Sequence, residues 1–271
     1  MTETPLSPAP VIIIPARYQS SRFPGKPLVQ IRGVDGTSKS LIERSIIAAR
    51  QVPFAKIYVA TDDDRIAQTA ARAGADVLMT SRDCANGTER VAEALKSLPY
   101  TPEFVVNFQG DALLTPANLV KDLVRHMAQD PECQVATVAV RCSSTAYKQL
   151  VEDQQHGRVG GTTAVTDRYN NALYFSKRVL PFWNPDAVAD EPPFLLHLGL
   201  YAYRINALAR YSVAPIPAIE RSEGLEQLRF LVEGIPVRIL ESEPPEWDVL
   251  ELNNPTDLEP IEAILASRGI S

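Results

Sequence analysis

Three cationic side chains, Arg17, Arg22 and Lys26, follow the first run of β-branched residues, 11–14. Such a continuous apolar run is typical of a buried central strand, because a half-exposed strand would alternate polar and apolar residues. Ligands bind at the carboxyl ends of such strands in open α/β sheets, and Gly25 lets the backbone approach a ligand closely. The loop is therefore a candidate binding site for a polyanion such as a nucleoside triphosphate. Charge alone leaves open the alternative that it is a solvated basic loop.

Two familiar phosphate loops do not fit this segment. A Walker A loop ending in Gly25-Lys26 needs Gly at position 20 and Ser or Thr at 27, where Ser20 and Pro27 stand. A dinucleotide fingerprint needs Gly-x-Gly-x-x-Gly after the strand, where the chain reads Pro15-Ala-Arg. We therefore expect side-chain charge to hold most of the phosphate.

A second candidate follows the apolar run 104–108, which ends in Gln109-Gly-Asp111. A carboxylate at the end of a central strand commonly holds Mg²⁺ that is bound to phosphate oxygens, and a turn or capping Asp is the alternative. Asn253 stands just before the N-cap of the last predicted helix, where its side chain can point into a cleft or simply belong to a loop. The acids 62–64 open a predicted helix, and its dipole explains them.

His197 lies on the predicted strand 194–204, on the face that carries Tyr201 and Tyr203, and is either a core histidine or a ligand contact. Three histidines without zinc spacing make a structural zinc unexpected. No Gly-x-Ser-x-Gly motif or Cys/His pair indicates covalent catalysis. Glu226 and Gln227 fall on a predicted helix, 220–233, whose solvated face is the plainer interpretation.

Composition narrows the class of protein. A net charge of −6 argues against a nucleic-acid partner, and no apolar run approaches the ~18 residues that cross a membrane. The three cysteines lack C-x-x-C spacing and indicate reduced thiols in the cytoplasm. Residues 1–10 carry no apolar core of a signal peptide, so we expect a disordered tail.

Strand and helix patterns alternate through the first half of the chain, with Asn86 as a predicted N-cap and Glu89 at N3. This order predicts an α/β fold with a doubly wound, mostly parallel sheet. The predicted strands are 11–14, 56–60, 76–79, 104–108 and 135–140; the predicted helices are 40–51, 64–73, 86–98 and 116–128.

The pattern changes in the second half. Segments 162–166 and 172–175 flank a polar turn and predict a β-hairpin, 237–240 predicts a last strand, and Asn254-Pro-Thr-Asp caps a final helix. We expect a single domain over 11–271. Its region 142–204 would carry the hairpin and cover the mouth of the active site or a dimer contact.

Taken together, these segments resemble the 3-deoxy-D-manno-octulosonate (Kdo) cytidylyltransferases, or CMP-Kdo synthetases, which are nucleotidyltransferases of the glycosyltransferase-A type fold. The resemblance covers 11–258. Its motifs are Ile14-Pro-Ala-Arg-Tyr-x-Ser-x-Arg-x-Pro-Gly-Lys-Pro27, Val59-Ala-Thr-Asp-Asp63, Gly87-Thr-Glu-Arg90, Gln109-Gly-Asp111, Ala172-Leu-Tyr-Phe-Ser176, His197-Leu-Gly-x-Tyr201 and Leu225-Glu-Gln-Leu-Arg229.

The resemblance implies that the anomeric hydroxyl of a 3-deoxy-2-ulosonic acid attacks the α-phosphate of CTP and releases pyrophosphate. It implies a homodimer, with Mg²⁺ as the cofactor. The implied catalytic residues are Arg17, Lys26 and Asp111, and the implied metal ligands are Asp111 and Asn253. The implied nucleotide site comprises Ala16, Arg17, Arg22, Lys26, Asn86, Arg90 and Gln109. The implied sugar-acid site comprises Arg22, Lys177, His197, Tyr201, Glu226 and Gln227.

The departures from the family pattern gather in the acceptor half. Asn253 stands where the family carries a metal-binding Asp, and the family's Gly-Asp-Glu-Pro reads Gly110-Asp-Ala-Leu here. Lys177 replaces an Arg, and Arg158-Val-Gly-Gly-Thr-Thr163 replaces an Asn-Pro-Asn-x-x-Lys stretch. We therefore expect an acceptor that differs from plain Kdo, such as an amino-modified or longer-chain ulosonic acid. The alternatives are a weakly catalytic paralogue that binds CTP or a sugar acid as a regulator, and a same-fold enzyme for another nucleotide.

Overall fold

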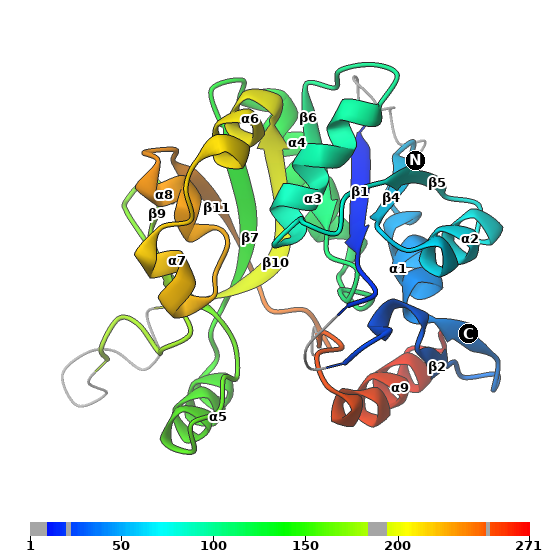
Figure 1. Cartoon of the computed structure of the whole chain (residues 1–271). Coiled ribbons are helices and arrows are strands. Elements are labelled where there is room, and N and C mark those ends of the chain that lie inside the picture. Colours follow the sequence, from blue (N-terminus) through cyan, green and yellow to red (C-terminus); the bar gives the residue numbers. More distant parts are fainter. Residues whose placement is uncertain (1–9, 20–22, 184–193, 248–249) are drawn as a thin grey trace. The chain divides into compact units, whose positions relative to one another are not determined.

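The computed structural model describes residues 10–19, 23–183, 194–247 and 250–271, which form two compact units (Figure 1). Unit 1 comprises Met1–Ala128 and Pro245–Ser271, and unit 2 comprises Gln129–Pro244. A single domain over 11–271 stays a prediction. The predicted tail lies outside the described residues except for Pro10, which is buried and accepts a hydrogen bond from Lys56 N at 2.9 Å.

Unit 1 is built on a parallel sheet in the order β6-β1-β4-β5. All residues of β1 and of β6 are buried, as the apolar runs predict for central strands. The four strands are β1 (Val11–Ala16), β4 (Lys56–Thr61), β5 (Asp76–Met79) and β6 (Phe104–Phe108).

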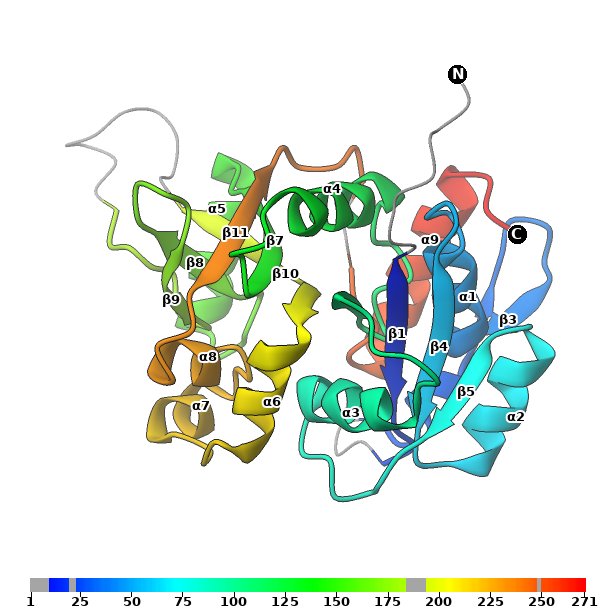
Figure 2. The ribbon, with the colours of Figure 1, turned by 90° about the horizontal axis from the view of Figure 1, so that it is seen from above.

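Helices connect these strands by right-handed crossovers. That handedness puts α1 and α2 on one face of the sheet and α3 on the other, and in Figure 2 α3 lies apart from the α1–α2 pair. The strand order therefore reverses at β1, the switch point where α/β sheets bind ligands. The α/β class with a doubly wound, mostly parallel sheet is confirmed. The connecting helices are α1 (Leu41–Ala49), α2 (Asp64–Arg72) and α3 (Gly87–Ala94), and α4 (Ala117–Gln129) follows β6.

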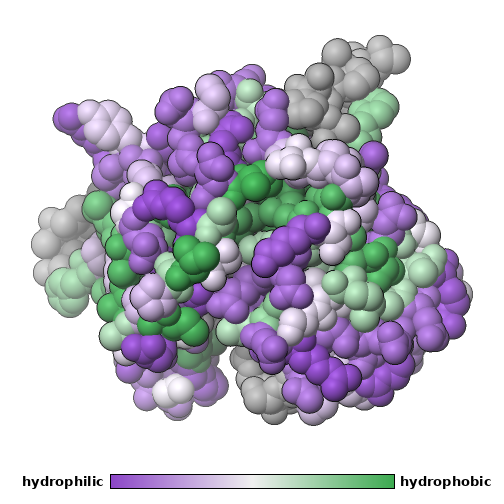
Figure 3. All heavy atoms as spheres, turned by 45° about the horizontal axis from the view of Figure 1, so that its top comes forward, coloured by the Kyte–Doolittle hydropathy of each residue, from purple (hydrophilic) through white to green (hydrophobic). Residues whose placement is uncertain are grey.

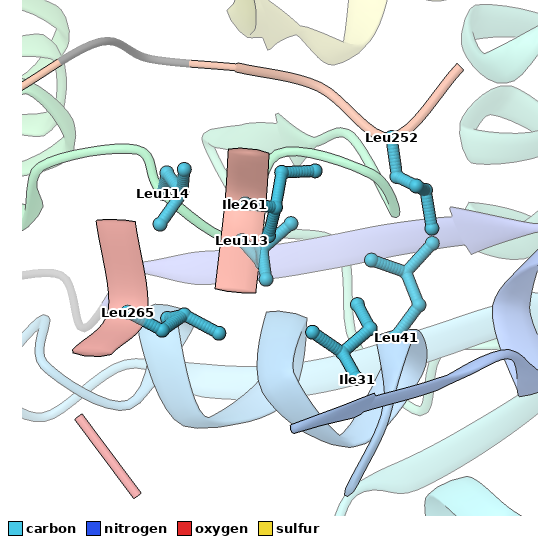
Figure 4. Close-up of a cluster of buried hydrophobic side chains, with 7 residues drawn as sticks. All are labelled: Ile31, Leu41, Leu113, Leu114, Leu252, Ile261 and Leu265. Atoms are coloured by element: carbon cyan, nitrogen blue, oxygen red, sulfur yellow. The ribbon is translucent and has the colours of Figure 1, made fainter. Parts of the chain in front are cut away.

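A hydrophobic cluster ties the C-terminal helix α9 (Leu258–Ser267) to the loop that follows β6 and to the small hairpin β2 (Gln30–Arg32)–β3 (Ser38–Ser40) (Figure 4). α9 follows a 3₁₀ turn, η3 (Pro255–Asp257), for which Asn254 is the N-cap, as predicted. The cluster comprises Ile31, Leu41, Leu113, Leu114, Leu252, Ile261 and Leu265.

Unit 2 contains a mixed sheet in which β7 (Val135–Arg141) pairs in parallel with β11 (Val237–Ser242) and antiparallel with β10 (Leu195–Arg204). The predicted hairpin is present as the antiparallel pair β8 (Thr163–Thr166) and β9 (Ala172–Ser176). Two helices that the sequence patterns did not predict, α5 (Ser144–Gln155) and α6 (Ile205–Val213), also belong to this unit.

The predicted helix over 220–233 is wrong. The chain forms two short helices, α7 (Ala218–Glu223) and α8 (Leu228–Val232), because Gly224 takes a left-handed conformation with φ +62° and ends the first. Glu226 and Gln227 therefore lie in the turn 224–227 between the helices.

Within the described residues, no helix is long and apolar enough to cross a membrane. On the face drawn in Figure 3, hydrophobic residues occur in patches bordered by hydrophilic ones.

Candidate functional site

Lys26 and Asp111 meet at the carboxyl edge of the unit 1 sheet. Lys26 begins the 3₁₀ turn η1 (Lys26–Leu28), and Gly25 before it is left-handed with φ +73°. The Lys26 Nζ lies 2.5 Å from Asp111 Oδ2, and both side chains are partly buried. Two residues 85 positions apart, each predicted to handle phosphate or metal, are thus in direct contact.

Glycines bring the neighbouring backbone segments together. A Cβ on Gly110 would lie 2.7 Å from the Pro15 carbonyl oxygen, so the ends of β1 and β6 approach as closely as only glycine permits. A Cβ on Gly87 would lie 3.0 Å from Nε2 of Gln109, which places that predicted nucleotide-site amide against the first turn of α3. Asn86 caps this helix, as predicted, and accepts a hydrogen bond from Glu89 N at 2.8 Å.

The remaining cations of the predicted nucleotide site differ in their environment. Arg17 is exposed, and its Nη1 lies 3.4 Å from the carbonyl oxygen of Ala85, just before the α3 cap. Ala16, the last residue of β1, is buried. Arg22 lies outside the described residues.

Arg90 lies inside the protein, with 2% of its surface exposed. Its guanidinium donates to Thr80 Oγ1 at 2.5 Å and to the Ser81 carbonyl at 3.2 Å, and it lies 3.5 Å from Asp62 Oδ2. These contacts join α3 to the segments after β4 and β5. Asp62 is therefore the partner of a buried cation, whereas only Asp63 and Asp64 of the acidic run fit the helix-dipole explanation.

Asn253 lies on the segment that packs beside the loop after Asp111. Leu252 shares the hydrophobic cluster with Leu113 and Leu114, and Trp247 Nε1 donates to the Leu114 carbonyl at 2.9 Å. The Asn253 amide Nδ2 lies 3.4 Å from Glu251 Oε2. Sequence reasoning missed Glu251, and the signal that could have found it is its place two positions before Asn253.

The side-chain oxygens of this site fit a Mg²⁺ ion that accompanies a bound nucleotide. Asp111 and Asn253 offer hard oxygen ligands, and Glu251 adds a carboxylate beside Asn253. Among the described residues, no three His, Cys, Asp or Glu side chains gather into a metal cage. Mg²⁺ often binds through one or two protein ligands and completes its shell with water and substrate phosphates, so a small donor set suits it.

In unit 2, His197 and Tyr201 lie side by side on β10, with ring centroids 5.2 Å apart. Four residues of regular strand span about 13 Å. The rings come closer because β10 bulges: Leu198 pairs with Val138, but Tyr201 pairs with Thr137. The glycine of the His-Leu-Gly-x-Tyr motif lies in that bulge.

Lys177 follows β9 and lies against the turn between α7 and α8. Its backbone N donates to Glu223 Oε2 at 3.0 Å, and Ser176 Oγ donates to Oε1 of the same carboxylate at 2.8 Å. The Lys177 Nζ is 2.8 Å from the position that a Cβ on Gly224 would take. The ammonium thus lies beside the turn that carries Glu226 and Gln227.

That turn is fixed by a buried ion pair. Arg229 is 2% exposed and donates to both carboxylate oxygens of Glu220, at 2.7 and 2.6 Å, which ties α8 to α7. Gln227 is equally buried, and its Nε2 has no hydrogen-bond partner in the described part of the chain. A buried amide donor of this kind fits a residue whose partner is a ligand.

Comparison with known proteins agrees with these features. A family model described as "Cytidylyltransferase" matches residues 11–241. The 3-deoxy-manno-octulosonate cytidylyltransferase of Maricaulis maris (strain MCS10) is 39% identical over 260 residues, covering 95% of this chain and 97% of its own. That of Syntrophobacter fumaroxidans (strain DSM 10017 / MPOB) is 40% identical over 259 residues, with the same two coverages.

A solved structure, CMP:2-keto-3-deoxy-manno-octonic acid synthetase complexed with CTP, superposes with a TM-score of 0.81 at 33% identity, covering 95% of this chain and 98% of that chain. Fold and site thus define a nucleotidyltransferase. The chain belongs to the cytidylyltransferase family, within its 3-deoxy-manno-octulosonate group, and the predicted resemblance and fold are confirmed.

Proposed function

We propose that this protein transfers CMP from CTP to the anomeric hydroxyl of Kdo or a close 3-deoxy-2-ulosonic acid. The observation that carries the proposal is the contact of Lys26 with Asp111 at the switch point of the sheet. A cation beside a carboxylate suits a site that must hold both triphosphate and its metal. The likeness to a synthetase complexed with CTP supports the nucleotide.

In the proposed reaction the anomeric oxygen bonds to the α-phosphorus, the bond from that phosphorus to the bridging oxygen breaks, and pyrophosphate leaves with that oxygen. The hydroxyl proton passes to solvent. Such a transfer needs charge neutralisation and alignment rather than a covalent catalyst. Arg17 and Lys26, with Arg22, supply the positive charge, while Ala16, Asn86, Arg90 and Gln109 shape the nucleotide site around the start of α3.

Asp111 and Asn253 would hold Mg²⁺, with Glu251 beside Asn253. When bound, Mg²⁺ would neutralise phosphate charge and lower the pKa of the attacking hydroxyl, so the chain needs no strong side-chain base. In the sugar-acid site Lys177 offers a cation, and His197, Tyr201, Glu226 and Gln227 offer polar contacts. The buried Gln227 amide supports this assignment.

We further propose that the acceptor is not plain Kdo. Lys177 supports this, because a compact ammonium grips a carboxylate or hydroxyl differently from the planar guanidinium of the family. Gly160, by contrast, leaves no space for a substituent of the sugar acid: a Cβ at that position would lie 2.5 Å from Asp153 Oδ2 on α5. Thr163 is buried and donates to the Arg178 carbonyl at 2.6 Å. The altered specificity therefore depends on Lys177.

We also propose that the protein acts in the cytoplasm and forms a homodimer. The three cysteines are free and buried, and burial raises each thiol pKa to about 11, as suits reduced structural thiols. Light scattering of the purified protein would test the dimer.

The decisive experiment measures pyrophosphate release from CTP and Mg²⁺ across a panel of ulosonic acids, with Asp111→Ala as the inactive control. ATP, GTP and UTP in place of CTP test the nucleotide. Turnover with at least one ulosonic acid is expected. CTP binding without turnover on any acceptor would instead favour the regulatory paralogue.

A further inference from the structure

Thr137 lies fully buried on β7, opposite the bulge of β10. The bulge inserts Gly199 and Leu200 between two paired positions and so interrupts the regular ladder. The Thr137 hydroxyl lies 2.7 Å from the Leu200 carbonyl oxygen. Its oxygen also lies 2.9 Å from Nε2 of His197.

The hydroxyl has one proton to share between these neighbours. Two oxygens 2.7 Å apart need a proton between them, and a carbonyl has none, so Thr137 donates to Leu200. The Thr137 oxygen can then only accept from the ring, which requires that Nε2 of His197 carries a hydrogen. A neutral imidazole has one N–H, so its Nδ1 is a bare acceptor.

The surroundings keep this ring neutral. Phe175 and Tyr201 flank it, with ring centroids at 5.1 and 5.2 Å, and burial lowers its pKa to about 3. Within the described part of the chain, the ring has no charged partner, and its one hydrogen bond joins Nε2 to Thr137. A neutral ring with a bare Nδ1 repels a carboxylate and attracts a hydrogen-bond donor.

We propose that Thr137 is a positioning residue that holds His197 in the Nε2–H form, so that Nδ1 accepts a hydrogen bond from a hydroxyl or ammonium of the sugar acid. The carboxylate of that acid must then bind elsewhere, and Lys177 is an exposed candidate cation of unit 2 beside the 224–227 turn. The identity of the ligand in this inference rests on the proposed function, whereas the protonation state of the His197 ring does not.

The ring can be observed directly, because the chain has only three histidines. In protein labelled with ¹⁵N-histidine, multiple-bond ¹H–¹⁵N spectra distinguish the two neutral forms, and His197→Gln assigns the signal. We expect the Nε2–H form, with its proton protected from solvent exchange. Thr137→Val should remove that protection, and Thr137→Ser should keep it. A ring in the Nδ1–H form, or unchanged protection in Thr137→Val, would overturn the positioning role.

Kdo and 8-amino-Kdo then test the contact. On saturation with either sugar acid, the Nδ1 signal should shift while Nε2 stays protonated. Thr137→Val should raise KM for the sugar acid by about tenfold, the value of one hydrogen bond, without changing KM for CTP. Protonation of Nδ1, or no change there while the sugar acid binds, would refute the contact. If neither acid binds, the proposed function and its ligand fail together, although the ring form is still established.

Discussion

Nζ of Lys26 lies 2.5 Å from Oδ2 of Asp111, so one carboxylate oxygen would serve both a lysine of the proposed phosphate loop and the proposed metal site. Phosphate oxygens of a bound nucleotide would attract the lysine, and the carboxylate would then be open to the metal that accompanies them. Under the proposed assignment, the ion pair would therefore couple nucleotide binding to metal binding at a single atom.

Loss of either partner should cut turnover severely, with opposite effects on the metal. Lys26→Ala and Asp111→Ala should each reduce kcat/KM by on the order of 10²–10³, because each removes a preorganised charge from the transition state. Without CTP, Lys26→Ala should bind Mn²⁺ more tightly than the wild type, since the competing ammonium is gone, and Asp111→Ala should bind it more weakly. Pyrophosphate release and Mn²⁺ electron paramagnetic resonance measure the two effects.

Lys96→Ala is the matched control, because Lys96 is exposed in the 3₁₀ turn η2 (Leu95–Ser97) that follows α3 and lies outside the site. Near wild-type turnover in both site variants would show that the site is assigned wrongly. Weaker Mn²⁺ binding in Lys26→Ala would exclude competition for the shared oxygen.

Asn253 should tolerate a carboxylate but not an apolar side chain. Asn253→Asp should keep activity and tighten Mg²⁺ binding, because it adds charge to a ligand of nearly the same shape, next to Glu251 at 3.4 Å. Asn253→Leu should be far more damaging. Asn254→Asp, which places the same charge on the exposed N-cap, should leave the Mg²⁺ dependence of turnover unchanged. If Leu and Asp at 253 are tolerated equally, Asn253 is outside the metal site.

The first half of the fold could be predicted because its signals are local. The apolar run of β6 ends at Phe108, where the structure ends that strand, whereas β1 continues two residues past its run 11–14, to Ala16. The Asn86 cap depends on its own helix alone. The proximity of Lys26 to Asp111 followed from a general rule, since both follow central parallel strands.

Other features depend on conformations and contacts that leave no periodic signal. Gly224 interrupts a helical pattern by taking a positive φ, which the residue types around it do not predict. Thr137 looked like one more residue of a β-branched strand, and only the bulge in β10 puts its hydroxyl beside His197. The motif predicts that Arg90 is a cation of the nucleotide site. Its burial beside Asp62 depends on tertiary contacts, which the motif does not show.

The Glu220–Arg229 pair should be essential for the stability of unit 2. Arg229→Met should lower the free energy of unfolding by ~3–5 kcal/mol, because it leaves the Glu220 carboxylate buried without its partner. Arg221→Met removes the same charge from an exposed position of α7 and should change the stability by less than ~0.5 kcal/mol. Urea unfolding measures both. The double variant Glu220→Leu/Arg229→Met should recover part of the loss, and failure to recover any would show that the packing of Arg229 on Tyr211 matters more than the unpaired charge.

His197 should make the fold sensitive to acid. Its pKa is about 3 in the folded protein, against about 6.5 when unfolded, so between these values the unfolded chain binds more protons. Stability should therefore be complete above about pH 6.5 and fall as the pH falls toward 3, by up to ~1.4 kcal/mol per pH unit from this group. His197→Gln should flatten that slope in urea titrations at pH 4.5 to 7. The exposed His156→Gln should not, and equal slopes in wild type and His197→Gln would contradict the assignment.

Lys177 should set the choice of acceptor. Its backbone is fixed by Glu223 and its ammonium lies over Gly224, a place where a guanidinium would need more room. Lys177→Arg restores the planar fork of the family and should raise kcat/KM for plain Kdo relative to 8-amino and nine-carbon analogues, whereas the exposed Lys148→Arg should leave that ratio unchanged. Sites matched to different polar groups can discriminate between acceptors by ~10⁴ in kcat/KM. A change of a tenth of that factor in the ratio of kcat/KM values is therefore measurable by pyrophosphate release. A clear preference of the wild type for plain Kdo, left unaltered by Lys177→Arg, would show that this lysine fulfils the role of the family's arginine and that the acceptor is the ordinary one.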